Sequence, residues 1–270
     1  MRSMALGIMT AALAFCEIFH LGGVRAEGAE AGRLAEIGAR GELRVCIWPD
    51  YFAMSWRSPR TGTLEGMDID MAEALARRLR VRLRFVETSF AEFAERLDQG
   101  DCDLAMMGVG ITPEREKRVD FSQPYLASPV YAVTPRSSAR VRQWSDLDRP
   151  GNVIAVVAGT RMEPLMRETL RHADLLVLRS PLSREQEVLA GRADAFMSDY
   201  PYTRRVLQAQ DWARVIEPPG AFGNSLYAYA VRKGDRAWLA EVNAFLAAAR
   251  ADGTLAAAAR RHGLTPVLVE

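Results

Sequence analysis

Short apolar runs alternate with amphipathic segments along the first half of the chain. Apolar runs at 43–47 and 81–86 flank the segment 67–79, in which apolar residues recur at helical spacing. This order predicts a strand, a helix and a second strand, with a further helix over 90–97. Strands that alternate with helices of this length imply an α/β fold with mostly parallel sheets flanked by helices.

Turn chemistry and an internal echo refine this organisation. The turn residues at 58–62 predict a small hairpin between the first strand and the helix. In two further segments a glycine ends a helix and an aspartate precedes a strand, which predicts two similar α/β halves. The two segments share one spacing: Leu97, Gly100, Asp103 and Met106, and Val188, Gly191, Asp194 and Met197.

The last part of the chain, 235–263, has an alanine-rich amphipathic pattern that breaks at Asp252-Gly253. We expect two helices whose apolar stripe covers the first half of the fold, because a covering helix needs one such stripe. This segment is assigned no chemistry.

The N-terminal segment 1–26 has the three parts of a secretory signal. Arg2 supplies positive charge, 4–16 is mostly apolar, and Val24-Arg25-Ala26 fits a small-x-small cleavage site. We interpret 1–26 as a signal peptide that is removed on export to the periplasm. Two alternatives stay open: a retained membrane anchor, against which the shortness of the run counts, and a lipoprotein modified at Cys16.

Composition excludes several classes of protein. The 270-residue chain carries 35 basic and 34 acidic side chains, and 49% of its residues are hydrophobic. These values describe a globular protein and argue against a disordered chain or a nucleic-acid binder. The absence of Gly-x-Ser-x-Gly and His-Glu-x-x-His motifs argues against a hydrolase or a zinc enzyme, and we expect no metal and no cofactor.

Two cysteines, Cys46 and Cys102, remain in the chain after removal of the signal segment. In an oxidising compartment an even count permits a disulfide, and the alternative is a pair of buried free thiols in neighbouring strands. The spacing does not decide between them, because a disulfide depends on geometry.

Several motifs follow one another in a specific order. They are Gly66-Met67-Asp68-Ile69-Asp70, Gly100-Asp101-Cys102-Asp103, Ile111-Thr112-Pro113-Glu114-Arg115, Val119-Asp120-Phe121-Ser122-Gln123-Pro124-Tyr125 and Gly191-Arg192-Ala193-Asp194-Ala195. Together they resemble the bacterial extracellular solute-binding proteins of family 3, the amino-acid-binding receptors of ABC importers. The similarity spans about residues 40–264.

The resemblance implies two α/β lobes joined by two crossing strands, near 126–131 and 225–230, with a ligand captured between them by hinge closure. Lobe 1 is then discontinuous, 40–127 plus 229–270, and lobe 2 is 128–228. It further implies a periplasmic receptor, not an enzyme, that delivers an amino acid or related small carboxylate to the membrane subunits of an ABC importer. We expect a monomer that binds no nucleic acid.

Two charged residues match the ligand-binding positions of that family. Arg115 falls where a Thr-x-x-Arg motif supplies the guanidinium for the ligand carboxylate, which a planar fork of donors suits. Its alternative role is a surface ion pair with Glu114 or Glu116. Asp199 matches the aspartate that binds the amino group, so the two residues would clamp a zwitterion. The alternative for Asp199 is a cap on the helix expected over 200–207.

The loop Gly159-Thr160-Arg161 follows the predicted strand 153–157 and precedes a helix, so its amides suit a carboxylate. Two residues depart from the family's pattern. Arg161 stands where Ser or Thr is common, and Gly110 stands where many members have a hydroxyl residue. Arg161 either adds a second anionic subsite, suited to a dicarboxylic ligand, or points to solvent. Gly108, on the same predicted strand as Gly110, completes the backbone wall.

Aromatic residues complete the predicted site. Tyr51 matches the aromatic side chain that stacks over the ligand in the family. Trp48, Trp56 and Tyr202 are expected to join it, with Tyr51 ranked first and Trp56 last. Aromatic walls offer apolar area and attract cations, but such residues also serve as ordinary packing.

Other classes of function stay open. Cyclohexadienyl and arogenate dehydratases resemble the same receptor fold and place a catalytic glutamate shortly after the position of Asp199, whereas 200–203 contains no carboxylate here. Receptor-like accessory proteins bind a periplasmic partner but lose the Thr-x-x-Arg motif, of which Thr112 and Arg115 are present. A sensor is equally compatible with a ligand cleft.

Overall fold

The computed structural model describes residues 32–179, 183–220 and 222–269. The predicted signal peptide at 1–26 lies outside these residues. No helix among them is long and apolar enough to span a bilayer.

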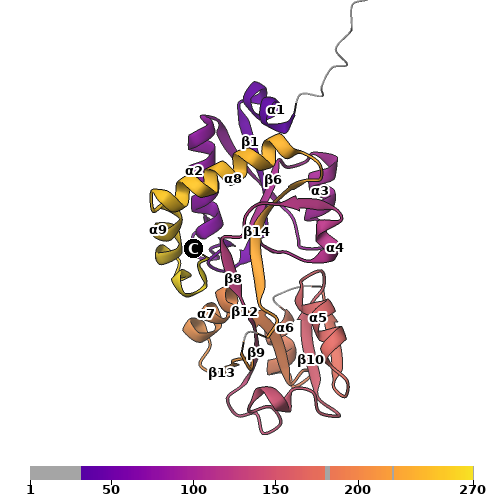
Figure 1. Ribbon diagram of the computed structural model, residues 1–270. Helices are drawn as coiled ribbons and strands as arrows, with labels where there is room; N and C mark the ends of the chain where they lie inside the picture. The colour runs from indigo at the N-terminus through magenta and orange to yellow at the C-terminus, as the bar shows by residue number, and fades with distance from the viewer. Residues whose placement is uncertain (1–31, 180–182, 221, 270) are drawn as a thin grey trace, which may run out of the picture. The chain divides into compact units, whose positions relative to one another are not determined.

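The first sheet contains β1 (Glu42–Ile47), β5 (Arg82–Glu87), β6 (Leu104–Gly110), β7 (Val119–Phe121), β8 (Leu126–Ser128) and β14 (Ser225–Arg232). Its strand order is β5-β1-β6-β14-β7, with β8 beside β14 (Figure 1). β1 runs parallel to β5 and β6, whereas β14 runs antiparallel to β6, β7 and β8. Every residue of β6 is buried, as expected for a strand covered on both faces.

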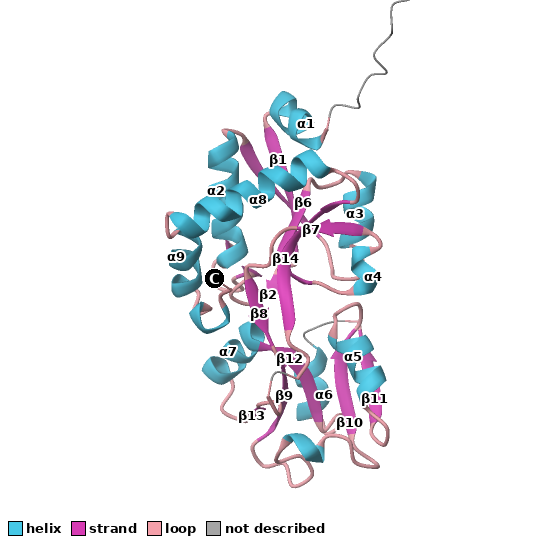
Figure 2. Cartoon of the chain, viewed as in Figure 1, coloured by secondary structure: helices cyan, strands magenta, loops and turns pink. Residues whose placement is uncertain are grey.

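Helices pack around this first sheet. They are α1 (Arg33–Arg40), α2 (Met67–Leu79), α3 (Phe93–Gln99), α4 (Pro113–Glu116), α8 (Arg236–Ala251), α9 (Thr254–Arg261) and the short 3-10 helix η2 (Thr265–Val267). Figure 2 shows α2 and α9 to the left of the sheet, α3 and α4 to its right, and α8 crossing in front of it. Trp238 and Leu255 of the terminal pair join the core of this half, so the predicted covering role of the pair is confirmed.

The second sheet contains β9 (Val130–Pro135), β10 (Val153–Val157), β11 (Asp174–Leu178), β12 (Ala195–Asp199) and β13 (Ala213–Ile216), in the order β11-β10-β12-β9-β13. The strands β10, β11 and β12 are parallel, and β9 is antiparallel to both of its neighbours. Around it lie α5 (Met162–Thr169), α6 (Ser183–Leu189), α7 (Tyr200–Ala209) and η1 (Trp144–Asp146).

The residue alternation of the second sheet creates a core on each face. Ile154 and Val156 belong to one apolar cluster, whereas Ala155 and Phe196 belong to another. This division follows from the two-residue period of a strand. The predicted α/β fold class is confirmed, and in both sheets the parallel strands are completed by antiparallel ones.

The predicted echo corresponds to one repeated structural device. Gly100 and Gly191 both have a positive φ, which ends the preceding helix. The backbone amide of Asp103 then donates to Arg44 O, and its carboxylate accepts from Arg44 N at 2.7 Å. Asp194 makes the same pair of bonds with Val153, where the carboxylate accepts at 2.8 Å. Each aspartate thus aligns its strand with the neighbouring parallel strand.

The predicted hairpin is confirmed, because β3 (Ser55–Arg57) pairs antiparallel with β4 (Leu64–Glu65). A third strand, β2 (Asp50–Tyr51), pairs with β3 and was missed, although it carries Tyr51. The helix expected from residue 90 begins at Phe93, because the amide of Phe93 closes a turn onto Ser89 O. Phe90 therefore stands in the turn after β5, outside the helix.

The chain passes between the two sheets where β8 gives way to β9. Only Pro129 separates these strands, and Ser128 pairs with Ser225 of β14. After β13 the chain returns to the first sheet through β14. Residues near 128 and 225 thus lie side by side, next to the carboxyl ends of strands from both sheets (Figure 1).

Candidate functional site

All the residues predicted from the sequence to bind a ligand line one pocket, except Trp56, which contacts Phe52 outside it. They are Trp48, Tyr51, Gly108, Gly110, Arg115, Thr160, Arg161, Asp199 and Tyr202. The lining also includes Phe90, Met162, Arg184, Ser198 and Tyr227, which were not predicted. The pocket lies where β1, β6, β10 and β12 end, and the carboxyl ends of such strands are where α/β sheets usually bind ligands.

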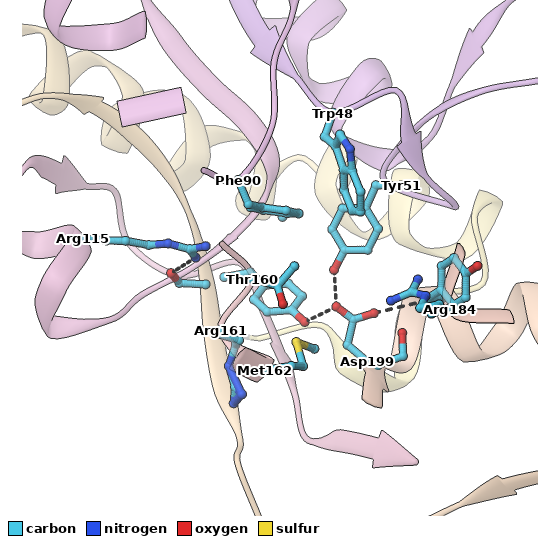
Figure 3. A pocket seen from close by; sticks show the side chains of 14 residues that line it. Trp48, Tyr51, Phe90, Arg115, Thr160, Arg161, Met162, Arg184 and Asp199 are labelled. Atoms are coloured by element: carbon cyan, nitrogen blue, oxygen red, sulfur yellow. Dashed lines mark hydrogen bonds between the residues drawn. The ribbon is translucent and has the colours of Figure 1, made fainter. Parts of the chain in front are cut away.

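Asp199 is both a helix cap and a wall of the pocket. It ends β12, and its Oδ1 accepts from the backbone amide of Tyr202 at 3.4 Å, which caps α7. Its Oδ2 accepts from the hydroxyl of Tyr227 at 2.8 Å and from that of Tyr51. Figure 3 shows Tyr51 pointing directly at this carboxylate. The helix cap considered for Asp199 is therefore observed, and the same side chain also lines the pocket.

The two phenols act as hydrogen-bond donors at any physiological pH. Burial, followed by the negative charge of Asp199, raises the pKa of Tyr51 and of Tyr227 well above the usual value near 10. They therefore stay protonated and direct their hydroxyl hydrogens at the carboxylate. Tyr51 follows β1 and Tyr227 belongs to β14, both strands of the first sheet, whereas Asp199 ends β12 of the second sheet. The hydrogen bonds among these three side chains therefore join the two sheets.

Arg115 lies in α4, whose N-cap is Thr112, and its guanidinium turns inward. Nη1 donates to Gly110 O at 2.7 Å and Nη2 to Gly159 O at 3.0 Å. Its Cζ lies 5.4 Å from the centroid of the Phe90 ring, a cation–π distance. Burial and the nearby charge of Arg161 lower the pKa of Arg115 to about 10, so it remains charged at neutral pH.

The alternative surface ion pair of Arg115 is not observed. Within the described residues, neither Glu114 nor Glu116 makes a salt bridge to it. A guanidinium has five N–H donors, and the carbonyls of Gly110 and Gly159 use two of them. The side chain therefore keeps donors for a carboxylate.

Two of the three amides of the 159–161 loop are already engaged. Gly159 N donates to Glu163 Oε2 at 3.1 Å, and Thr160 N donates to Val157 O at 3.2 Å. The chain's own Glu163 thus takes the place of an external anion at Gly159, and a carboxylate site at the amide of Arg161 stays a prediction. The loop also contributes side chains, and Arg161 is partly buried in the pocket wall.

Glycines give two side chains their place in the pocket. A Cβ on Gly108, whose φ is 62°, would lie 2.7 Å from Cε1 of Tyr51. A Cβ on Gly110 would lie 2.8 Å from Oγ of Ser225 and 3.2 Å from Cδ of Arg161. All three distances are shorter than ordinary van der Waals contact. The absence of side chains at Gly108 and Gly110 is therefore what admits Tyr51 and Arg161.

An aromatic group forms another wall. The ring centroids of Trp48 and Phe90 are 5.0 Å apart, and Tyr51 lies 5.6 Å from Trp48 and 5.8 Å from Phe90. Across the pocket, Tyr202 stacks under the guanidinium of Arg184, whose Cζ is 3.6 Å from the ring centroid. The walls thus combine apolar area with positive charge.

The residues that sequence reasoning missed had weak signals. Phe90 was assigned to a helix that begins three residues later. Arg184 stands in a charge-rich segment that reads as a solvated face, yet it is only 5% exposed. Tyr227 had a usable signal, because it lies in the crossing strand predicted near 225–230. The two-residue period of that strand places it on the same face as Ser225, whose Oγ lies beside Gly110 of the pocket.

Metal chemistry finds no support in the described residues, which contain no group of three His, Cys, Asp or Glu side chains able to hold an ion. Cys46 and Cys102 form a disulfide in the first half, with Cα atoms 5.6 Å apart. Both cysteines are buried behind the pocket walls rather than in them.

Comparisons with known proteins point to one family. The sequence model of the bacterial extracellular solute-binding proteins, family 3, matches residues 43–265. Cyclohexadienyl dehydratase of Pseudomonas aeruginosa is 31% identical over 228 residues, 84% of each chain. L-cystine-binding protein TcyJ of Escherichia coli (strain K12) is 28% identical over 229 residues, 85% of each chain.

A similar fold occurs in a solved structure of an ancestral amino acid-binding protein, AncCDT-1, described as a precursor of cyclohexadienyl dehydratase. That structure aligns with a TM-score of 0.78 at 34% identity and covers 84% of this chain and 98% of its own. The chain thus resembles binding proteins and an enzyme that share one architecture, and the contents of the pocket must distinguish them.

Proposed function

Since the chain belongs to the bacterial extracellular solute-binding proteins of family 3, we propose that it is a periplasmic receptor that captures an amino acid or related small carboxylate in this pocket. The ligand then passes to the membrane subunits of an ABC importer. The proposal includes export by the signal peptide at 1–26 and action as a monomer.

The observation that carries this proposal is the setting of Arg115. A partly buried guanidinium with unused donors binds a carboxylate more strongly than an exposed one does, because less water competes for it. The walls around it are aromatic, which suits a small organic molecule. Asp199 faces the same pocket and supplies a pole for an amino group.

We place the division between lobes at 40–127 plus 229–270 and 128–228, with the pocket between them. Tyr51, Gly110 and Arg115 come from segments of the first sheet, and Thr160 and Asp199 come from segments of the second. A ligand that binds both groups of residues favours the closed arrangement by its differential affinity for that state.

The test is the substitution Arg115→Ala, measured by titration calorimetry on ligand-stripped protein with a panel of amino acids and carboxylic acids. The loss of a charge-assisted pair is expected to weaken binding by about 2 to 4 kcal/mol, roughly 30- to 1,000-fold in Kd. Arg118→Ala is the matched control, because Arg118 is exposed three residues further on. Unchanged affinity in Arg115→Ala would remove this pocket from consideration.

An enzymatic role is the second candidate, because one relative is a cyclohexadienyl dehydratase. A dehydratase needs an acid that protonates the leaving hydroxyl. Among the residues that line the pocket, Asp199 is the carboxylate, and it already accepts from two phenols and an amide. The phenols themselves hold their protons too tightly. Incubation with cyclohexadienyl carboxylic acids, followed by absorbance of an aromatic product, tests this candidate, and turnover would replace the receptor proposal.

A further inference from the structure

Arg161 lies between two glycines. A Cβ on Gly110 would stand 3.2 Å from its Cδ, and a Cβ on Gly223 would stand 3.5 Å from its Nη2. A side chain at Gly110 would therefore displace the stem of Arg161, whereas a Cβ at Gly223 would only touch its guanidinium at an ordinary van der Waals distance. Gly110 thus provides the room that the stem of Arg161 occupies.

The guanidinium of Arg161 is not neutralised by the protein. Its Nη1 is buried and has no hydrogen-bond partner within the described residues. In the same part of the chain it makes no salt bridge, and Figure 3 shows its side chain running away from Asp199. A buried cationic nitrogen without an acceptor is costly unless an anion satisfies it.

Arg115 approaches the same glycine with its guanidinium. The imagined Cβ on Gly110 would be 3.6 Å from Nη1 of Arg115 and 3.2 Å from Cδ of Arg161, so the guanidinium of Arg115 and the stem of Arg161 flank this glycine. The mutual repulsion of the two arginines contributes to the lowered pKa of Arg115. Two like charges kept together at the wall of a pocket are stabilised most by a ligand that brings a negative group to each.

The net charge of the residues that line the pocket is positive. Arg115, Arg161 and Arg184 line the pocket against one carboxylate, Asp199, an excess of two positive charges. The charge of Asp199 is already stabilised by the hydroxyls of Tyr51 and Tyr227. The pocket therefore has more anion-binding capacity than a zwitterion with a single carboxylate uses.

Building on the receptor role proposed above, we propose that the ligand is a small dicarboxylate, one carboxylate on Arg115 and the second on Arg161. The arrangement disfavours a cationic ligand, since no second carboxylate among the lining residues would receive it. An amino group is compatible with the site through Asp199 but is not required.

The experiment uses pairs of ligands that differ in one charge and little in shape. They are L-glutamate with L-glutamine, L-aspartate with L-asparagine, and succinate with succinamate, each titrated calorimetrically into purified, ligand-stripped protein. The second carboxylate is expected to improve Kd at least tenfold in one or more pairs, the scale of a charge-assisted hydrogen bond. L-arginine is expected not to compete.

Arg161→Met keeps an unbranched, flexible stem and removes the guanidinium with its charge. This variant is expected to reduce the preference for the dicarboxylate to less than about threefold while it retains binding of the matched monoamide. Arg171→Met is the control, because Arg171 is exposed in the turn after the same helix. Thermal unfolding of each variant verifies that the fold is intact, and Arg161→Lys is expected to recover part of the preference.

The outcomes separate this inference from the receptor proposal. If monoamides bind as well as their acids and Arg115→Ala abolishes both, the receptor stands and the dicarboxylate assignment is wrong. If Arg161→Met leaves the preference intact, the second subsite is not at Arg161 and the assignment is again overturned. If no compound of the panel binds the wild-type protein, both proposals fail together.

Discussion

Reduction of the disulfide between Cys46 and Cys102 should lower the stability of the protein substantially. The two cysteines are 56 positions apart in the sequence, so the bond closes a long loop of the unfolded chain. The loop-entropy relation gives about 4 kcal/mol for a loop of this length. A chain of this size loses roughly 2 to 4 °C of Tm per kcal/mol, which predicts a decrease of roughly 8 to 16 °C.

The assay is thermal unfolding of the protein without residues 1–26, so that Cys16 does not contribute a thiol. Three samples are compared: the oxidised protein, the protein refolded in reductant, and the double substitution Cys46→Ala with Cys102→Ala. The second and third samples are expected to agree, because both lack the cross-link. A control in reductant with the double substitution isolates any effect of the reductant itself.

Two results would refute this reasoning. Two titratable thiols in the unreduced, denatured protein would show that the cysteines are not joined. An unchanged Tm on reduction would show that the bond adds no stability even if it forms. The position of the disulfide links its stability to the pocket. β1 is followed by Trp48 and Tyr51, and β6 contains Gly108 and Gly110, all of which line the pocket. Binding titrations on the reduced protein would show whether the cross-link also holds the pocket walls in register.

Two further predictions concern buried carboxylates. Asp199→Asn should weaken the binding of L-glutamate but not of glutarate in calorimetric titrations, because only L-glutamate has an ammonium group. Equal losses of affinity for the two ligands would contradict a role of Asp199 in binding the amino group. Burial raises the pKa of Asp68 from 3.8 to about 7, so the folded state holds a proton that the unfolded state releases between these values. Stability should therefore fall as pH rises from about 4 to about 7, by up to about 4 kcal/mol, and level off above. Asp68→Asn should flatten this slope in urea titrations at each pH, and a slope that persists would assign it to other groups.

The order of elements was predictable because the hydrophobic periods are clear. The segment 67–79 and the strand 153–157 were placed correctly from periodicity and turn residues alone. The two-residue strand β2 was not, since a strand that short has no measurable period. Element boundaries near Phe90 also failed, because the tertiary position of its ring and a turn onto Ser89 decide where the helix begins.

The pocket was predictable in its members but not in its internal bonds. Motif positions brought Arg115, Arg161 and Asp199 to one place, yet no pattern in the sequence indicates that Asp199 accepts from two phenols. Contacts of this kind join residues far apart in the chain and depend on how segments of both sheets meet. Arg184 was missed for a related reason, because its burial against Tyr202 is a tertiary property.

The double duty of Asp199 limits how the specificity of this pocket can evolve. The same carboxylate lines the pocket and accepts a hydrogen bond from the amide of Tyr202 at the start of α7. Asn, Ser and Thr also cap helices well, so a lineage can remove the negative charge at this position and keep the helix start intact. Replacement by an aliphatic residue would weaken the helix by about 1 kcal/mol as well as the binding pole. Selection for a new ligand is therefore limited to a few small polar residues at position 199. Arg161 does not have this constraint, because its side chain caps no helix.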